Sequence, residues 1–275
     1  MSALLDALEA DYQNNGRRSL DTLRFRLKPL REAFGQDRAR DVTAARITEY
    51  VRDRLAVKKA RATVNRELAA LRRAFALAID QERLSAVPRV RLMADNNARQ
   101  GFVTPADFER IVAELPEYLR DVARFGYLTG WRRREVITLE WSGVDLDGQR
   151  LTLRRERSKN GQPRTVPFVG SLGEIIARRH AIRGECWYVF HRNGRPIRDF
   201  RGSWDNACEA AGKPGLLFHD LRRSAVRNLV SAGVDQSVAM RITGHKTVSV
   251  FQRYRIVADD DVRPRWHGRT WRSRR

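Results

Sequence analysis

The sequence predicts an α+β protein that is mostly helical and divided into two domains. Three observations indicate this fold class. Residues 1–95 carry several apolar stripes at helical spacing, residues 144–168 contain an alternating stretch with two turn signals, and a polar stretch at 96–101 separates the two regions. The length of 275 residues agrees with two domains. We therefore expect an N-terminal helical domain followed by a mixed domain with a small antiparallel β-sheet.

Three helices are predicted in the N-terminal region from their apolar spacing. Residues 20–34 form one apolar stripe, and Pro29 lies inside it, so we expect a kink or a break at that point. Thr43 is the expected N-terminal cap of a second helix. Thr63 is the expected cap of a third helix, which presents one apolar face.

Three arginines of the third helix, Arg66, Arg72 and Arg73, lie off its apolar face. Such charges are usually only solvated, but this chain has 54 Lys and Arg against 33 Asp and Glu, a net charge of +21. That excess favours an anionic partner, most simply nucleic acid, with acidic lipid or mere solubility as the alternatives. The basic residues lie on predicted folded elements and favour a shaped binding surface.

The second region begins with a helix signal. Thr104 is the expected cap and Pro105 the expected first helical residue. The next helix is expected over 117–128, which places Arg132 beside a helix boundary. Residues 135–139 are expected to open a further helix.

Two turn signals mark the small β-sheet. Asp147-Gly148 precedes an alternating stretch at 150–154, and Asn160-Gly161 separates that stretch from a returning strand at 165–168. This arrangement places Lys159 at a hairpin turn.

Chemically distinctive side chains occur in short motifs that follow one another along the chain. They are Thr129-Gly130-Trp131-Arg132-Arg133-Arg134-Glu135, Lys159, His219-Asp220-Leu221-Arg222, Gly244-His245, and Tyr254 nine residues later. The arginines, histidines and tyrosine suit attack on a phosphodiester without a metal ion. Guanidinium groups can hold the non-bridging oxygens, an imidazole can share a proton with them, and a phenol can be the nucleophile.

This ordered set resembles the tyrosine recombinases, the phage integrase family. Their pattern reads Thr-Gly-x-Arg-x-x-Glu, a Lys on a β-hairpin, His-x-x-Arg, Gly-His, and a Tyr nine residues on. Each motif alone is weak, and their ordered occurrence over about half of the chain carries the resemblance. It implies an integrase-like, site-specific DNA recombinase that cleaves and rejoins duplex DNA through a 3′-phosphotyrosyl intermediate.

The resemblance also implies a domain organisation. Residues 1–95 would form a helical core-binding domain that contacts DNA, and residues 96–101 a linker. Residues 102–262 would form the catalytic domain, and residues 263–275 an Arg-rich tail.

Roles for the motif residues follow from the same resemblance. Tyr254 is the expected nucleophile, and it needs help to lose its proton at neutral pH. Arg132 and Arg222 are expected to stabilise the charge on the phosphate. His219 is expected to accept a proton from Tyr254 or to hydrogen-bond the phosphate, and His245 to donate to a non-bridging oxygen.

Two further residues have less direct roles. Lys159 is the candidate general acid for the departing 5′-oxygen, with a solvated turn lysine as the alternative. Glu135 is expected to support the site by orienting Arg132 or a nearby backbone amide. Asp220 beside His219 permits a metal interpretation, but no paired-ligand spacing supports one, so we expect neither a metal ion nor a cofactor.

Two rival functions fit the same scaffold. One is a DNA-binding protein with weak catalysis, and the other is a DNA-relaxing topoisomerase. The C-terminus favours the first, because Tyr254 is followed by Arg255-Ile256-Val257, an acidic run and an Arg-rich end, where the family usually has an amphipathic helix that docks on a neighbouring protomer.

The expected partners are double-stranded DNA and further copies of this chain, as a tetramer on DNA. No apolar run approaches the ~20 residues of a membrane span, and the acidic start does not resemble a secretory signal. Cys186 and Cys208 are too few for a disulfide framework and favour a reducing, cytoplasmic setting, nucleoid-associated in a bacterium, although a bridge between them stays open.

Overall fold

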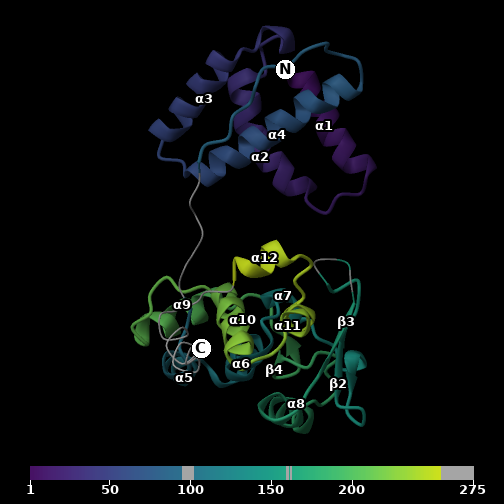
Figure 1. The fold of residues 1–275 in the computed structure, drawn as a ribbon, viewed down its shortest axis with the longest axis vertical. Coiled ribbons are helices and arrows are strands. Elements are labelled where there is room, and N and C mark those ends of the chain that lie inside the picture. Colours follow the sequence, from purple (N-terminus) through teal and green to yellow (C-terminus); the bar gives the residue numbers. More distant parts are fainter. Residues whose placement is uncertain (95–101, 159–160, 162, 255–275) are drawn as a thin grey trace, which may run out of the picture. The chain divides into compact units, whose positions relative to one another are not determined.

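The computed structural model describes residues 1–94, 102–158, 161 and 163–254. The chain divides into two compact units, Met1–Ala98 and Arg99–Arg275 (Figure 1). The division falls within the stretch that the sequence marks as a linker. The assignment of core-binding and catalytic domains to these regions stays a prediction at this point.

Helices alone make up the regular structure of the first unit within residues 1–94. They are α1 (Ser2–Asn14), α2 (Leu20–Phe34), the short 3-10 helix η1 (Ala39–Asp41), α3 (Ala44–Ala56) and α4 (Arg61–Asp80). Helix α4 packs against α1, α2 and α3, as Figure 1 shows. Leucine and aromatic side chains from all four α-helices close one hydrophobic core, so α4 is the central element of this unit.

The local predictions for this unit had mixed outcomes. Thr43 caps α3, because its hydroxyl oxygen accepts from the Arg46 amide at 3.2 Å. The expected cap at Thr63 is wrong: the cap is Ala60, three residues earlier, and its carbonyl already accepts from the Thr63 amide at 2.8 Å. Helix α2 also runs without a break through Pro29. Buried side chains on both sides of the proline hold the two halves in one helix.

The second unit combines helices with two small sheets. In order they are α5 (Pro105–Glu114), α6 (Glu117–Thr129), α7 (Arg133–Ile137), η2 (Trp141–Gly143), β1 (Val144–Asp145), β2 (Arg150–Leu153), β3 (Arg164–Pro167), α8 (Ser171–Ala181), β4 (His191–Arg192), β5 (Arg195–Pro196), α9 (Arg201–Ala210), η3 (Phe218–Asp220), α10 (Leu221–Ser231), α11 (Gln236–Thr243) and α12 (Val248–Gln252). This mostly helical architecture with small antiparallel sheets confirms the predicted fold class.

Helix boundaries in this unit follow the sequence signals closely. Thr104 caps α5 by accepting from the Asp107 amide at 3.2 Å, and Pro105 is the first helical residue. Helix α6 ends at Gly130, which has a left-handed φ of 63°. The helix predicted to open at 135–139 begins earlier, at Arg133, because Glu135 accepts from the Arg132 amide and caps the helix from within, and it already ends at Ile137.

The larger sheet is antiparallel, with β2 between β1 and β3. Leu151 pairs with Val166 in a register that places alternate side chains of both strands in the core. The β2–β3 hairpin is therefore held by its buried face. Lys159 and Asn160, at the predicted turn, lie outside the described residues.

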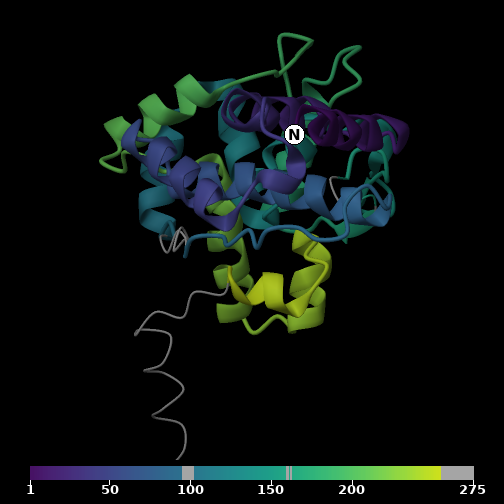
Figure 2. The ribbon, with the colours of Figure 1, turned by 90° about the horizontal axis from the view of Figure 1, so that it is seen from above.

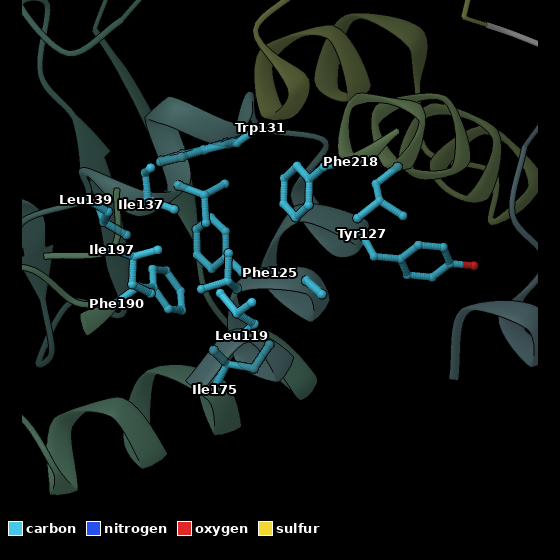
Figure 3. Packing of buried hydrophobic residues seen from close by; sticks show 14 of the residues in the cluster. Leu119, Phe125, Tyr127, Trp131, Ile137, Leu139, Ile175, Phe190, Ile197 and Phe218 are labelled. Carbon is cyan, nitrogen blue, oxygen red and sulfur yellow. The ribbon is translucent and has the colours of Figure 1, made fainter. Parts of the chain in front are cut away.

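Aromatic side chains form the centre of the second unit's core (Figure 3). Phe125 of α6 makes edge-to-face contacts with Trp131 and Phe190, in each case with ring centroids 5.3 Å apart. The Trp131 indole also donates to the Ile242 carbonyl at 3.0 Å. Trp131 thus anchors its neighbour Arg132 to both the core and α11.

A second, smaller core lies among the last three helices, drawn in green and yellow in Figure 2. Val226, Ala239 and Phe251 are fully buried there, one each from α10, α11 and α12. This cluster fixes α12 against α10 and α11. No helix among the described residues is long and apolar enough to cross a membrane.

One buried polar cluster in the first unit has a testable consequence for stability. Glu67 of α4 is only 3% exposed, and its carboxylate accepts from the Tyr50 hydroxyl at 2.7 Å. Both of its oxygens also accept from Arg54, at 2.6 and 3.0 Å. Glu67 therefore links α3 to α4 through a largely buried salt bridge that contains two hydrogen bonds.

We expect Glu67→Ala to destabilise the first unit by about 3 kcal/mol, because it leaves a largely buried guanidinium and a buried phenol without their acceptor. The matched control is Glu49→Ala, which removes an exposed carboxylate of α3 that pairs with Arg46 and Arg52. Such surface pairs contribute roughly 0–1 kcal/mol. Hydrogen–deuterium exchange of the full chain provides the measurement. Equal exchange of α3 and α4 in the two variants would contradict the assigned role of Glu67.

Candidate active site

Arg222 carries a deeply buried guanidinium. Arg222 lies in the first turn of α10 and is 2% exposed. Its Nη1 donates to the Gly130 carbonyl at 2.6 Å and to the Thr243 carbonyl, and its Nε donates to Nε2 of His245 at 3.2 Å. Burial, and then the charge of Arg132, lower the pKa of Arg222 to about 9, so the guanidinium stays charged at neutral pH.

The carbonyls that hold Arg222 belong to two helix C-termini. Helix α6 ends in Thr129-Gly130 and α11 ends in Thr243-Gly244, and both glycines adopt left-handed φ values, 63° and 72°. The C-terminus of a helix carries partial negative charge and unpaired carbonyls. Two such ends converge on one guanidinium, which explains how a positive charge is tolerated there, although no carboxylate of the described residues pairs with it directly.

Thr243, in the turn that ends α11, determines which nitrogen of His245 carries the proton. Thr243 donates to the Ala239 carbonyl at 2.7 Å, so its hydroxyl oxygen is free to accept from Nδ1 of His245, also at 2.7 Å. Nδ1 therefore carries the proton, and Nε2 presents a lone pair to Arg222. In this geometry His245 orients Arg222 and does not donate from Nε2. Burial first, and then the charge of Arg222, lower the pKa of His245 to about 3.

Tyr254 lies beside these groups because α12 leads the chain back to them. Thr247 caps α12, and Phe251 is buried against the His245 ring at a centroid distance of 5.4 Å. The Tyr254 hydroxyl lies 3.2 Å from Nε2 of His219. Its ring centroid lies 4.8 Å from that of His245 and 5.6 Å from the Arg222 guanidinium carbon.

His219 reaches this position from the short 3-10 helix η3. The neighbouring Asp220 accepts from the Leu217 amide at 2.9 Å, which closes the turn. Phe218, the residue before His219, is held in place by edge-to-face packing on Phe200 and Trp204. Asp220 thus has a structural role in the turn that carries His219.

Arg132 is held by Glu135. The Glu135 carboxylate accepts from the Arg132 amide at 3.0 Å and from its Nη1 at 2.9 Å. It also accepts from Nη2 of Arg164 at 2.6 Å. Burial acts to raise the pKa of Glu135, but the charges of Arg164 and Arg132 outweigh it and lower that pKa, so the carboxylate is ionised at neutral pH.

The structure therefore brings together most of the motif residues named from the sequence. His219 and Tyr254 meet, Arg222 and His245 meet, and Arg132 is held by Glu135, whereas Lys159 lies outside the described residues. Motif reading missed Arg164 and Thr243. Their sequence signals were weak: Arg164 opens the returning strand of the hairpin, and Thr243 repeats the Thr-Gly pair of Thr129-Gly130.

Comparison with known proteins identifies the family. The model of the phage integrase family matches residues 101–260. This protein belongs to the phage integrase family. The resemblance stated from the motifs is thus confirmed, and the chain is a tyrosine-type site-specific recombinase by membership.

Similar proteins include a tyrosine recombinase and a phage integrase. The chain is 28% identical over 287 residues to the tyrosine recombinase XerC of Mycobacterium bovis, covering 94% of this chain and 95% of that protein. It is 26% identical over 191 residues to the integrase of Salmonella phage P22, a match that covers 65% of this chain and only 49% of the phage protein.

Solved structures of similar fold include DNA complexes. The integrase of transposon Tn1549, in complex with circular intermediate DNA, matches with a TM-score of 0.78 at 17% identity, covering 96% of this chain and 98% of that chain. A lambda integrase tetramer bound to a Holliday junction matches with a TM-score of 0.76 at 21% identity, covering 99% and 79%. At these identities the likeness establishes the fold.

The protonation of His245 gives a pH prediction. We expect ¹⁵N NMR of the imidazole to show a neutral ring with the proton on Nδ1 and no titration between pH 5 and 8. The unfolded chain takes up a proton below about 6.5, whereas the folded ring does so only near 3. The stability contributed by the neutral ring is therefore complete above about pH 6.5 and is lost as pH falls toward 3.

Thr243→Val serves as the matched variant, because it keeps the size and shape of the side chain and removes the acceptor for the Nδ1 proton. We expect it to alter the tautomer signal of His245. A His245 resonance that titrates near pH 6.5 in the unmodified protein would show that the ring is not held as described.

Proposed function

We propose that this protein cleaves and rejoins duplex DNA at specific sites, with Tyr254 as the nucleophile. The observation that carries the proposal is the 3.2 Å separation between the Tyr254 hydroxyl and Nε2 of His219, beside the buried Arg222 guanidinium. A phenol needs a base within hydrogen-bond reach to attack at neutral pH, and His219 is such a group. Family membership supports the same reaction.

The charge balance of the site fits a phosphodiester. Arg132 and Arg164 pair with the buried carboxylate of Glu135. The guanidinium groups of Arg222 and Arg223 lie over the Tyr254 ring. Nη2 of Arg222 is buried and, within the described part of the chain, has no hydrogen-bond partner. A buried donor without an acceptor is costly, and a phosphate oxygen is an acceptor of suitable charge.

The proposed chemistry is a balanced transesterification. The Tyr254 oxygen bonds to phosphorus while the bond from phosphorus to the 5′-oxygen breaks, which leaves a 3′-phosphotyrosyl link and a free 5′-hydroxyl. The phenolic proton passes to His219, and Lys159 is the proposed donor of a proton to the 5′-oxygen. Reversal of these steps rejoins the strand, so no nucleotide cofactor is needed. Within the described ranges, no cluster of His, Cys, Asp and Glu is placed to hold a metal ion.

The domain and partner assignments belong to the same proposal. Residues 1–95 act as the core-binding domain and residues 102–262 as the catalytic domain, and both contact double-stranded DNA. A lambda integrase relative is a tetramer on a Holliday junction, which supports assembly of this protein into a tetramer on DNA. A cytoplasmic location follows from that substrate. Residues 263–275 lie outside the described residues.

The rival functions predict different products. A weakly catalytic DNA-binding protein would bind DNA without a covalent adduct. A topoisomerase would form the adduct and relax supercoils without exchanging strands between two duplexes. The proximity of His219 to Tyr254 argues against the first, and assays with one and two duplexes separate the second.

We expect Tyr254→Phe to abolish the covalent protein–DNA adduct and to leave DNA affinity unchanged, because only the phenolic oxygen is removed. Tyr118→Phe is the matched control, since Tyr118 is half-buried in the first turn of α6, at the opposite end of that helix from Thr129. Denaturing gels of a nicked suicide substrate, run with and without EDTA, measure the adduct. An adduct that persists in Tyr254→Phe, or that requires a divalent ion, would refute the proposed reaction.

Duplex affinity should depend steeply on salt. The logarithm of the binding constant should fall linearly with the logarithm of salt concentration, with a slope of about −0.9 for each phosphate contacted. Arg66 and Arg72 are exposed on α4, off its buried face. Arg66→Ala and Arg72→Ala should each reduce the slope by roughly one contact. Arg52→Ala is the control, because Arg52 pairs with Glu49 and Asp53; a flat slope in the unmodified protein contradicts a phosphate-dominated surface.

A further inference from the structure

Arg164 links parts of the site that are far apart in the sequence. It opens strand β3 and its side chain is 7% exposed. Its Nη2 donates to Glu135 at 2.6 Å, and its guanidinium carbon lies 4.6 Å from the Trp131 ring centroid. The same guanidinium fills the space beside Gly244, where a Cβ atom would lie 1.7 Å from Nη1.

The contact with Glu135 affects Arg132. The carboxylate carries one negative charge, and both Arg164 and Arg132 donate to it. Arg132 therefore does not take the whole of that charge, and part of its positive field remains available to a phosphate. Without the charge of Arg164, the Glu135 carboxylate would bind Arg132 more strongly, because a carboxylate in a buried site interacts strongly with its remaining cation. Less of the Arg132 charge would then be available to a phosphate.

The contact with Gly244 affects His245. Gly244 adopts a left-handed φ of 72° and ends α11 directly before His245. A side chain at this position would be strained by the backbone conformation and would displace the Arg164 guanidinium. The absence of a side chain at Gly244 thus allows β3 to approach the turn that holds His245, and strand β3 packs against α11.

We propose that Arg164 is a positioning residue for the strand-cleavage reaction. It sets the charge and orientation of Arg132 through Glu135, and it supports the Gly244–His245 turn from strand β3. This inference rests on the proposed function, since its main readout is cleavage. In this role Arg164 acts through the groups that it contacts, Glu135 and the Gly244–His245 turn.

The first test compares Arg164→Met with unmodified protein. Methionine retains an apolar stem over Trp131 and removes the charge. We expect adduct formation at saturating protein to slow by roughly 10²-fold, the typical cost of displacing a catalytic group by about 1 Å. Duplex affinity should change less than about threefold, because one buried charge contributes little to a surface that contacts many phosphates. Arg150→Met, at an exposed position on the adjacent strand β2, is the matched control.

Modified substrates distinguish an effect of Arg164 on the non-bridging oxygens, through Arg132, from an effect on the leaving group. A methylphosphonate at the cleavage site replaces one charged non-bridging oxygen with a neutral methyl group, so it lessens the need for the Arg132 charge. We expect the Arg164→Met defect to shrink on this substrate. A sulfur at the 5′-bridging position only helps the leaving group, and it should leave the defect intact. The opposite pattern would show that Arg164 serves the leaving group, and it would overturn the proposal.

A double substitution tests the charge argument directly. Glu135→Gln removes the carboxylate charge that Arg164 shares with Arg132. If the proposal holds, Arg164→Met combined with Glu135→Gln should cleave faster than the product of the two single effects predicts. Multiplicative defects would mean that Arg164 has only a structural role. Arg164→Lys, which keeps the charge, should recover part of the rate and covers the case in which Arg164→Met fails to fold.

The outcomes for the two proposals are distinct. Absence of any adduct in the unmodified protein would contradict the proposed function itself. An adduct in the unmodified protein, with Arg164→Met and Arg150→Met both at the unmodified rate, would leave that function standing and would overturn the role of Arg164.

Discussion

The buried guanidinium of Arg222 is the constraint on which the rest of the candidate active site depends. A charge that is 2% exposed requires several acceptors, and these come from the C-terminal ends of α6 and α11 and from the His245 ring. Both helix ends must therefore converge on one point in space. The position of His245, and through α12 that of Tyr254, follow from meeting this requirement.

Glu135 imposes the second constraint, because it is the buried carboxylate among several cations. It fixes the start of α7 by accepting from the Arg132 amide, and it receives Arg132 and Arg164 on its two oxygens. Each contact lowers the cost of burying the others. The cluster keeps a net positive charge, which suits the phosphodiester substrate that we propose.

Packing of aromatic side chains in the hydrophobic cores positions the polar residues of the site. Trp131 lies edge-to-face on Phe125 and places Arg132, Phe218 packs between Phe200 and Trp204 and places His219, and Phe251 places Tyr254. In each case a buried aromatic residue lies within three positions of a motif residue. Each of these motifs therefore contains both a chemically reactive side chain and a buried aromatic side chain that holds it in position.

The sequence by itself determined the fold class, the helix starts at Thr43 and Thr104, and most of the residues that meet around Tyr254. These features depend on local capping rules and on ordered motifs. It did not determine the start of α4 or the continuity of α2 through Pro29, since packing on both sides outweighed local preference. Only the tertiary structure decided the roles of Arg164 and Thr243 and the tautomer of His245. Those depend on contacts between segments far apart in the chain, and a surplus of arginines leaves no local signal to mark which ones are buried.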